Sequence, residues 1–272
     1  MSRVQDARRY LARTLVRDAL VAYRHRGLRP DDVFLASYPR AGSNWVKFLL
    51  LESITGRDLT FPESDEMMPY VGDHHSAPNV LPDGGRLLKT HEWYRQQYGR
   101  SIYLVRDPRD VVLSEYKYLA GRGKYTRGFD RFVEEFVGGT ATGLGFWGDH
   151  VLSWLEADPA KVHVVRYEDL RADPAGGLAA MLDFLGISRS HEEIERAVEN
   201  NTLQRMREKE DAARSSRANF QDLQDGYRFV NTGAVGGWQA ELREEQVRAL
   251  EARAAPILAR LGYAARREMA TR

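Results

Sequence analysis

The amino-acid sequence predicts a single α/β domain in which a central parallel β-sheet is flanked by helices. Two observations lead to this prediction. Short apolar segments typical of buried strands alternate with longer helical patterns, and no stretch has the composition of a domain linker. A length of 272 residues, 43% of them hydrophobic, suffices for a substantial core. We find neither an internal repeat nor a low-complexity segment.

The first part of the chain is expected to alternate between helix and strand. Residues 4–26 have the spacing of an amphipathic helix, and "DDVFLASY" reads as a buried strand before a helix from about Asn44 to Thr55. We expect the first helix to pack on its own domain, although a basic amphipathic helix also suits a membrane surface. Residues 56–85 hold four prolines and lack a sustained period, so we expect a long irregular segment before the strand "RLLKTH".

The second part continues the alternation and contains the remaining strands. "SIYLVRDPRDVVLSEYKY" predicts a strand, a turn and a helix that begins with Pro108, because proline suits the first helical position. Helical patterns follow over "FDRFVEEFV" and "WGDHVLSWLE", and "KVHVVRYEDL" predicts the fourth strand. Helices are expected over most of the remaining chain. This order is typical of a parallel sheet covered on both faces.

Charge and composition exclude several classes of function. The 40 Lys and Arg against 39 Asp and Glu leave a net charge of +1, so any anion site must be local and no global field favours nucleic acid or membrane. The absence of cysteine excludes disulfides, zinc–thiolate sites and thiol nucleophiles. We identify neither a signal peptide nor an apolar run that could span a bilayer, and we therefore expect a cytoplasmic protein. The bias toward Arg and Ala suits a bacterial genome.

The stretch "FLASYPRAGSNWVKFLL" predicts an anion-binding turn between a strand and a helix. The backbone N–H groups of Gly42, Ser43 and Asn44 would face an anion at the helix N-terminus, and Arg40 adds a permanent positive charge. The stretch lacks the Gly-Lys-Ser/Thr ending of the nucleoside triphosphatase loop. A plain strand–turn–helix connection is the alternative, but it does not favour Arg, Ser and Asn together.

Three predicted strands end in polar residues that would converge at one edge of the sheet. These ends are Tyr38–Asn44, Lys89–His91 and Arg106–Asp110, and ligands of parallel α/β sheets bind beyond the carboxyl ends of the strands. Arg106 stands where triphosphatases place an acidic metal ligand, so no magnesium site is predicted. We therefore expect an anion held by protein cations without a metal.

Several motifs together resemble the cytosolic-type sulfotransferase family. "YPRAGSNW" resembles its 5′-phosphosulfate loop, Tyr-Pro-Lys-Ser-Gly-Thr-Thr-Trp, and "VRDPRDVVLSEYKY" is similar to its 3′-phosphate segment, Arg-Asn-Pro-Lys-Asp-Val-x-x-Ser-x-Tyr. "GAVGGW" at 233–238 resembles its closing Gly-x-x-Gly-Asp-Trp element. The resemblance covers about residues 33–240 with matching order and spacing. It implies a P-loop-like nucleotide-binding (sulfotransferase) fold, and the composition suggests a bacterial member.

The resemblance implies one sulfotransferase domain over residues 1–272, divided into an N-terminal helix (1–30), a catalytic core (33–240) and C-terminal helices (241–272). It implies transfer of a sulfuryl group from 3′-phosphoadenosine 5′-phosphosulfate (PAPS) to a hydroxyl or amine of a small or medium organic acceptor. The product would be adenosine 3′,5′-bisphosphate (PAP), and no metal is required. A small-molecule kinase of the P-loop class and a non-catalytic nucleotide-binding protein of the same fold are the alternatives.

The resemblance also assigns roles to individual residues. His91 would be the general base, and Lys89 and Arg40 would stabilise the leaving phosphate, as imidazole titration near neutrality and the positive charges permit. The turn would hold the phosphosulfate, Arg106 and Ser114 the 3′-phosphate, and other residues the adenine. The residues expected to bind PAPS are Arg40, Ala41, Gly42, Ser43, Asn44, Trp45, Arg106, Ser114, Tyr167, Thr202, Leu203, Met206 and Gly233.

The chain departs from the family pattern at several positions. The loop lysine is Arg40, which cannot readily donate a proton. The usual Arg-Lys before the closing glycine is Asn231–Thr232, a common base-stacking phenylalanine is Leu203, and the closing aspartate is Gly237. The short C-terminal dimer motif of many relatives is absent around 239–248, so no dimer of that kind is expected. The cations considered as substitutes at the 3′-phosphate are Arg214, Arg217 and Arg228.

The acceptor pocket is expected to be walled by residues 61–85, 120–128, 138–147 and 210–230. Their aromatic residues favour an apolar or aromatic acceptor. Glycine- and arginine-rich stretches at 121–128 and 211–219 are expected to close over a ligand. Four other histidines are assigned to structural or surface roles: His74, His75, His150 and His163. The aromatic residues of the expected wall are Phe61, Tyr70, Tyr125, Phe146, Trp147, Phe220 and Tyr227.

Overall fold

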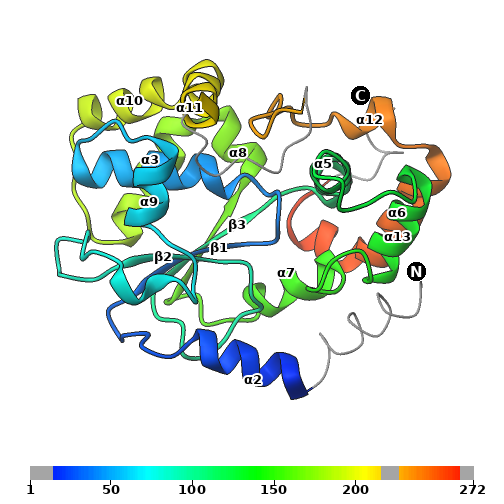
Figure 1. Cartoon of the computed structure of the whole chain (residues 1–272), viewed down its shortest axis with the longest axis horizontal. Helices are drawn as coiled ribbons and strands as arrows, with labels where there is room; N and C mark the ends of the chain where they lie inside the picture. The colour runs from blue at the N-terminus through cyan, green and yellow to red at the C-terminus, as the bar shows by residue number, and fades with distance from the viewer. Residues whose placement is uncertain (1–14, 216–226, 264–272) are drawn as a thin grey trace.

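A four-stranded parallel sheet forms the centre of the protein (Figure 1). The computed structural model describes residues 15–215 and 227–263. Within these residues the strand order is β2-β1-β3-β4, and every neighbouring pair is parallel. The predicted parallel sheet of an α/β domain is therefore confirmed. The strands are β1 (Val33–Ser37), β2 (Leu87–Thr90), β3 (Ser101–Val105) and β4 (Val162–Arg166).

The order of the strands creates a switch point between β1 and β3. The chain passes from β1 to β2 on one side and then crosses to β3 on the other side. Segment 69–71 extends the sheet beside β2, since the Val71 N–H donates to the Lys89 carbonyl (2.9 Å) and the Lys89 N–H donates to the Pro69 carbonyl (2.9 Å). In open parallel sheets a crevice for ligands forms at such a switch point, beyond the carboxyl ends of the strands.

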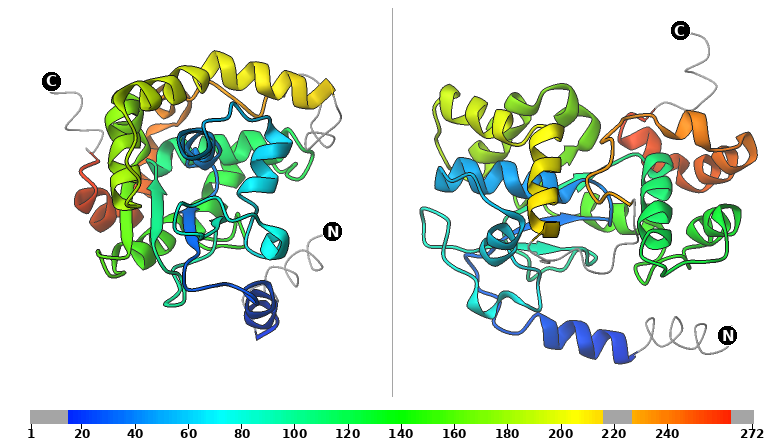
Figure 2. Two further views of the ribbon diagram at one scale, coloured as in Figure 1. Left: turned by 90° about the vertical axis from the view of Figure 1, so that its left-hand side faces the viewer. Right: turned by 45° about the horizontal axis from the view of Figure 1, so that its top comes forward.

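Helices cover both faces of the sheet (Figures 1 and 2). Successive strand residues point to opposite faces. On one face Phe34 and Tyr103 pack with Trp154, whose ring is parallel to that of Tyr103 at a centroid distance of 5.0 Å. On the other face Leu35 and Ile102 belong to a second buried cluster. The first face is covered by α5 (Pro108–Ala120), α6 (Phe129–Gly138), α7 (Trp147–Leu155) and α13 (Glu244–Arg260).

The second face is covered by helices that follow β1 and β4. Their apolar residues, such as Leu50, Leu178 and Met181, are fully buried and account for most of this core. These helices are α3 (Ser43–Thr55), α8 (Tyr167–Ala172), α9 (Pro174–Phe184), α10 (His191–Asn200) and α11 (Leu203–Ser215). A short helix, α12 (Trp238–Glu241), follows the closing segment. The division of the chain into 1–30, 33–240 and 241–272 stays a prediction.

Local sequence signals explain where the helices begin. Asp107 accepts a hydrogen bond from the Arg109 N–H and Pro108 occupies the first turn of α5, as predicted. Asp173 and Pro174 begin α9 in the same way. The Asp107 cap turns the chain sharply after β3 and leaves that strand end accessible beside the N-terminus of α5, whereas the Asp173 cap follows α8.

Residues 56–85 are more regular than predicted. The segment contains α4 (Phe61–Met67), which begins with a capping box between Thr60 and Glu63, and a 3₁₀ turn, η1 (His74–Ser76). The prolines misled the sequence interpretation because Pro62 lies in the first turn of α4, where its missing N–H costs nothing.

The N-terminal helix, α2 (Leu15–Arg24), continues to within two residues of the predicted end, and the earlier part of the 4–26 prediction lies outside the described residues. Arg24 donates to the Val71 carbonyl (2.8 Å), so α2 packs on segment 69–71. Across residues 15–215 and 227–263 no helix combines the length and apolarity needed to cross a membrane.

Candidate functional site

A cavity of about 390 Å³ lies beyond the carboxyl ends of the strands. Residues after all four strands line it, and its volume is in the range of small-molecule sites. The three strand ends that the sequence singled out therefore meet at one place. Every residue that was expected to bind PAPS or act in catalysis lines this cavity except Ala41 and Thr202.

The turn after β1 requires unusual backbone geometry. Gly42 has φ +103° and is the N-cap of α3, and a Cβ atom at this position would lie 2.7 Å from the ring of Tyr167. Only glycine fits this position, because L side chains avoid such φ values and the ring leaves no room. Arg40 also has a positive φ, +67°, the only such non-glycine residue in the described chain. The turn is thus shaped so that its backbone faces the cavity.

The guanidinium of Arg40 is held between two aromatic rings. Its Cζ atom lies 4.5 Å from the Tyr118 ring centroid and 4.8 Å from that of Phe229. Its Nε atom donates to the Ser114 hydroxyl (3.3 Å). The aromatic rings and the hydrogen bond fix the charge on the α5 side of the cavity.

Lys89 is a buried cation beside the turn. It is 2% exposed, donates a hydrogen bond to the side-chain oxygen of Asn44, and lies 5.0 Å from the Tyr70 ring centroid. Burial lowers the pKa of its ammonium to about 7, with the charge of Arg40 contributing in the same direction. An anion in the cavity would therefore find an ammonium that is short of a charged partner.

His91 has a defined orientation. Its Nδ1 atom is 2.8 Å from the Ser37 carbonyl oxygen, which can only accept, so Nδ1 carries the proton. Nε2 is then an acceptor, and it lies 3.2 Å from the hydroxyl of Tyr70. Burial, with the nearby charge of Lys89, lowers the pKa of the imidazole to about 3. His91 is therefore a neutral base with its lone pair directed into the cavity region near Tyr70.

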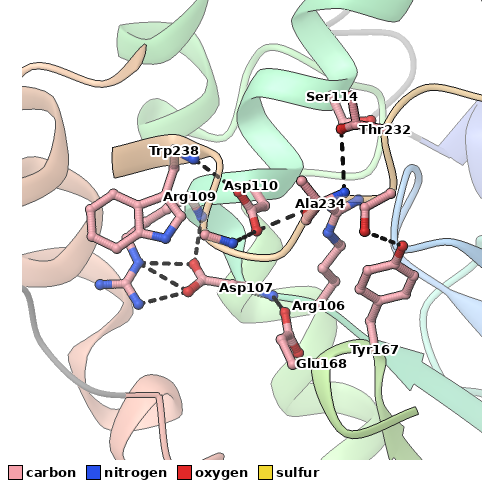
Figure 3. Close-up of polar contacts among 12 residues, drawn as sticks. Arg106, Asp107, Arg109, Asp110, Ser114, Tyr167, Glu168, Thr232, Ala234 and Trp238 are labelled. Carbon is pink, nitrogen blue, oxygen red and sulfur yellow. Dashed lines mark hydrogen bonds and ion pairs between the residues drawn. The ribbon is translucent and has the colours of Figure 1, made fainter. Parts of the chain in front are cut away.

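Arg106 joins the end of β3 to the closing segment 233–238 (Figure 3). It donates to the Ala234 carbonyl (2.8 Å) and to the Arg40 carbonyl (3.5 Å), and its guanidinium lies over the Tyr167 ring at 4.6 Å. Its buried Nε–H has no hydrogen-bond partner among the described residues. A buried donor without a partner at a cavity wall is suited to bind a ligand anion.

Asp110 holds the closing segment against α5. It accepts hydrogen bonds from the N–H groups of Gly236 (2.8 Å) and Trp238 (3.1 Å) and lies 3.7 Å from Arg106 (Figure 3). The Tyr167 hydroxyl donates to the Gly233 carbonyl (3.0 Å). Two strand ends and the closing segment are therefore tied together around the cavity.

Aromatic and apolar side chains form the far wall of the cavity. The Trp45 indole N–H donates to the Asn201 carbonyl (2.9 Å), and its ring meets Tyr167 edge-on at 6.0 Å. Arg171, which also lines the cavity, lies 5.3 Å from the Trp45 ring centroid. Leu203 and Met206 complete this wall. Such a wall suits a flat, uncharged group such as a nucleobase.

Two predicted contact residues lie elsewhere. Ala41 is 1% exposed and packs in the core of the second face, so only its backbone faces the turn. Thr202 is exposed and accepts a hydrogen bond from the Arg205 N–H at the start of α11. Its side chain begins a helix and does not line the cavity.

Of the four segments predicted to wall the acceptor pocket, 61–85 and 210–230 reach the cavity, through Tyr70 and through Phe229 and Val230. Of the aromatic residues named individually, Tyr70 alone lines the cavity, and Phe220 lies outside the described residues. Tyr227 packs against α5 at Gly121, where a Cβ atom would approach its ring to 2.5 Å. The others are buried in the two cores, because large apolar rings gain more from complete burial: Phe61, Tyr125, Phe146 and Trp147.

Two of the three arginines proposed to replace the missing Arg-Lys pair, Arg214 and Arg228, do not line the cavity, and the third, Arg217, lies outside the described residues. Arg214 is paired with Glu210 (2.7 Å) and Arg228 with Asp211 (3.1 Å), so both charges have acidic partners on α11. Asn231 does line the cavity, as an uncharged residue.

Sequence reasoning missed several lining residues. Tyr118 and Arg171 lie one helical turn after Ser114 and Tyr167, so helix periodicity could have found both. Glu115 and Phe229 carried no comparable signal. The sequence also predicts a structural role for His150, and its Nδ1 atom lies 3.0 Å from the Tyr103 hydroxyl in the core.

Residues 30–262 match the family model described as "Sulfotransferase domain". The chain is 25% identical to mouse sulfotransferase 2A6 over 239 residues, covering 82% of this chain and 83% of the relative. It is 26% identical to a flavonol sulfotransferase-like protein of Flaveria bidentis over 222 residues, covering 71% and 70%.

Solved structures share the fold. A retinol dehydratase in complex with androsterone and the inactive cofactor PAP superposes with a TM-score of 0.72 at 24% identity, covering 90% of this chain and 85% of that one. Mouse sulfotransferase SULT7A1 in complex with PAP superposes with a TM-score of 0.66 at 24% identity, covering 89% and 88%. At this identity the likeness concerns the fold.

Proposed function

This chain belongs to the sulfotransferase family, and we propose that it transfers the sulfuryl group of PAPS to a hydroxyl or amine of a small or medium organic acceptor. One observation carries the proposal. The acceptor nitrogen of His91, the buried ammonium of Lys89 and the glycine turn after β1 line the same cavity. A base, a cation and an anion-binding turn are the groups that this transfer needs.

The donor is assigned to the side of the cavity between β1 and β3. The N–H groups of the 42–44 turn would hold the phosphosulfate, and the unpaired Nε–H of Arg106 would face the 3′-phosphate. The adenine would lie against the wall formed by Trp45 and Tyr167. No metal takes part in the proposed reaction.

His91 is proposed as the general base. The acceptor oxygen or nitrogen attacks sulfur, the bond from sulfur to the bridging oxygen of the 5′-phosphate breaks, and that electron pair stays on PAP. The acceptor proton passes to Nε2 of His91, which is the unprotonated nitrogen because Nδ1–H donates to the Ser37 carbonyl. Lys89 and Arg40 would stabilise the charge that develops on the leaving phosphate.

The low pKa of His91 is compatible with this role. In the free protein the ammonium of Lys89 helps to lower it, so the imidazole is neutral at physiological pH. Bound PAPS would bring negative charge beside both groups, and negative charge favours the protonated imidazole. The base would thus gain strength when the donor is present.

The nature of the acceptor is also a proposal. Androsterone and retinol occupy retinol dehydratase structures of the same fold. Tyr70, Tyr118 and Phe229 line this cavity and would contact an apolar or aromatic acceptor. Bacterial origin, cytoplasmic location and the absence of a family-type dimer stay predictions.

Calorimetric titration with PAP tests the proposal. We expect PAP to bind the wild type and to bind Arg106→Ala more weakly, with adenosine 5′-phosphate binding poorly to both. An acceptor screen that measures PAP release from PAPS should follow. Stronger binding of magnesium adenosine triphosphate would favour the kinase alternative, and binding of neither nucleotide would refute a nucleotide-dependent transferase.

A further inference from the structure

Glu115 is an unexplained carboxylate in the cavity wall. It follows Ser114 on α5, lines the cavity and is 5% exposed. Its Oε2 atom has no hydrogen-bond partner among the described residues. Buried carboxylates almost always have partners, because an unpaired one is costly to remove from water. A group that is buried, unpaired and at a cavity is placed to meet a ligand.

No hydrogen-bond donor among the described residues pairs with Oε2 of Glu115. Arg40 is the cation whose charge acts on it, yet the guanidinium of Arg40 is turned toward the Ser114 hydroxyl and lies between the rings of Tyr118 and Phe229. Burial raises the pKa of the Glu115 carboxyl to about 7. A nearby positive charge on a ligand would therefore stabilise its ionised form.

The charged side chains that line the cavity are mostly positive. Its lining contains the cations Arg40, Lys89, Arg106 and Arg171, and Glu115 is the only acidic residue in the lining among the described residues. PAPS carries roughly four negative charges at neutral pH. Once the donor is bound, the lining cations have an anionic partner and the carboxylate has none.

We propose that Glu115 selects acceptors that carry an ammonium group, by pairing with that group when the acceptor is bound. The inference rests on the proposed sulfuryl transfer and narrows its acceptor class to aminated phenols or alcohols. An ammonium is the complement of a buried carboxylate, and partial exclusion of water strengthens their attraction. Glu115 is thus a specificity residue, since it is not among the groups proposed to bind the donor or to take the acceptor proton.

Matched acceptors test the inference. Tyramine and 4-ethylphenol present the same phenol with and without an ammonium, and 4-hydroxyphenylacetate replaces it by a carboxylate. Binding of each to the PAP complex is measured by calorimetry, and kcat/KM is measured with PAPS. We expect tyramine to be preferred over 4-ethylphenol by about ten- to a hundredfold, the range of a charge-assisted hydrogen bond. The carboxylate should be the poorest acceptor.

Two variants separate recognition of the ammonium group from other roles of Glu115. Glu115→Gln should reduce the preference for tyramine over 4-ethylphenol to near one, chiefly through a higher Kd of tyramine. Glu134→Gln, at an exposed position on α6, should keep the preference and controls for a change in total charge.

Three outcomes would overturn the inference: no preference in the wild type, no binding of either phenol to the PAP complex, or a preference that survives in Glu115→Gln. Weaker PAP binding by Glu115→Gln with an unchanged preference would instead identify Glu115 as a positioning residue for Arg40. Failure of the wild type to bind PAP would refute the proposed function itself.

Discussion

Among the described residues, buried charged side chains have all their hydrogen-bond partners at one end of the sheet and lack some of them at the other. At the amino ends of β1 and β2, Arg86 makes two 2.7 Å bonds to the carboxylate of Asp32 and also donates to the carbonyls of Gly27 (2.9 Å) and His74 (3.2 Å). At the carboxyl ends, the Nε–H of Arg106 and the Oε2 of Glu115 have no partner among the described residues. One end of the sheet therefore holds a fully hydrogen-bonded ion pair, and the other end holds charged groups with unused hydrogen-bonding capacity.

The comparison teaches how a structural charge differs from a functional one. Arg86 and Asp32 are each 1% exposed and leave no cavity between them, so the pair has nothing to offer a ligand. At the other end the protein leaves hydrogen-bonding capacity unused beside a cavity of about 390 Å³. Such unused capacity lowers stability, and a bound anion or cation would restore it.

The largest effect is expected at His91. Replacing it by Ala should lower kcat by about 10²–10⁴, the usual contribution of a general base, while PAP affinity and the unfolding midpoint stay near those of the wild type. Initial rates of PAP release measure this. His163→Ala, on β4 outside the cavity, is the matched control and should retain activity. A fully active His91→Ala would remove His91 from the mechanism.

The opposite end of the sheet should respond in stability alone. Arg86→Ala leaves Asp32 buried without its partner, and we expect a loss of about 3–5 kcal/mol in the free energy of unfolding. Urea denaturation followed by circular dichroism measures this loss. Arg57→Ala, which breaks an exposed pair with Glu63, should cost less than about 1 kcal/mol. Equal effects of the two variants would contradict the distinction between the two ends.

Arg106 should matter for ligand binding more than for stability. Arg106→Ala should weaken PAP binding by about ten- to a hundredfold, because it removes charge-assisted donors to the 3′-phosphate. Adenosine 5′-phosphate, which lacks that phosphate, should bind the variant and the wild type alike. An equal loss for both nucleotides would indicate that Arg106 acts by holding Ala234 and the closing segment.

A smaller effect is expected from the proton on Lys89. Its pKa of about 7 lies below that of a free lysine, about 10.4, so the free protein loses this proton as the pH rises above 7. PAP binds the charged form better, and its affinity should therefore fall by up to about tenfold per pH unit between pH 7.5 and 8.5, with uptake of a proton. Calorimetry in buffers of different ionisation enthalpy measures the uptake. Lys89→Arg should abolish the uptake, and unchanged uptake would assign it to another group.

Local sequence signals predict much of the fold and many of the residues that line the cavity. Strands buried on both faces appear as short apolar runs, and capping residues such as Asp107 with Pro108 mark a helix start wherever it lies in the fold. Gly42 was singled out for the same reason, since its φ of +103° is a property of one residue and its neighbours.

The acceptor wall and the surroundings of Arg40 depended on tertiary structure. Phe146 and Trp147 look like pocket aromatics in the sequence, yet both are buried in the core of the first face, where the ring of Phe146 meets that of Phe136 on α6 at 6.5 Å. Phe229 is held beside Arg40 by Glu210 of α11, whose carboxylate accepts hydrogen bonds from the N–H groups of Phe229 (2.9 Å) and Val230 (2.8 Å).

The sequence by itself determined where most strands and helices begin, with α4 as an exception, and which charged groups follow the strands. Only the tertiary structure decided which of those charges are paired. Pairing depends on long-range distances and on exclusion of water, as the contrast between Asp32 and Glu115 illustrates. Both are buried carboxylates, but the fold places the guanidinium of Arg86 beside Asp32 and a cavity beside Glu115.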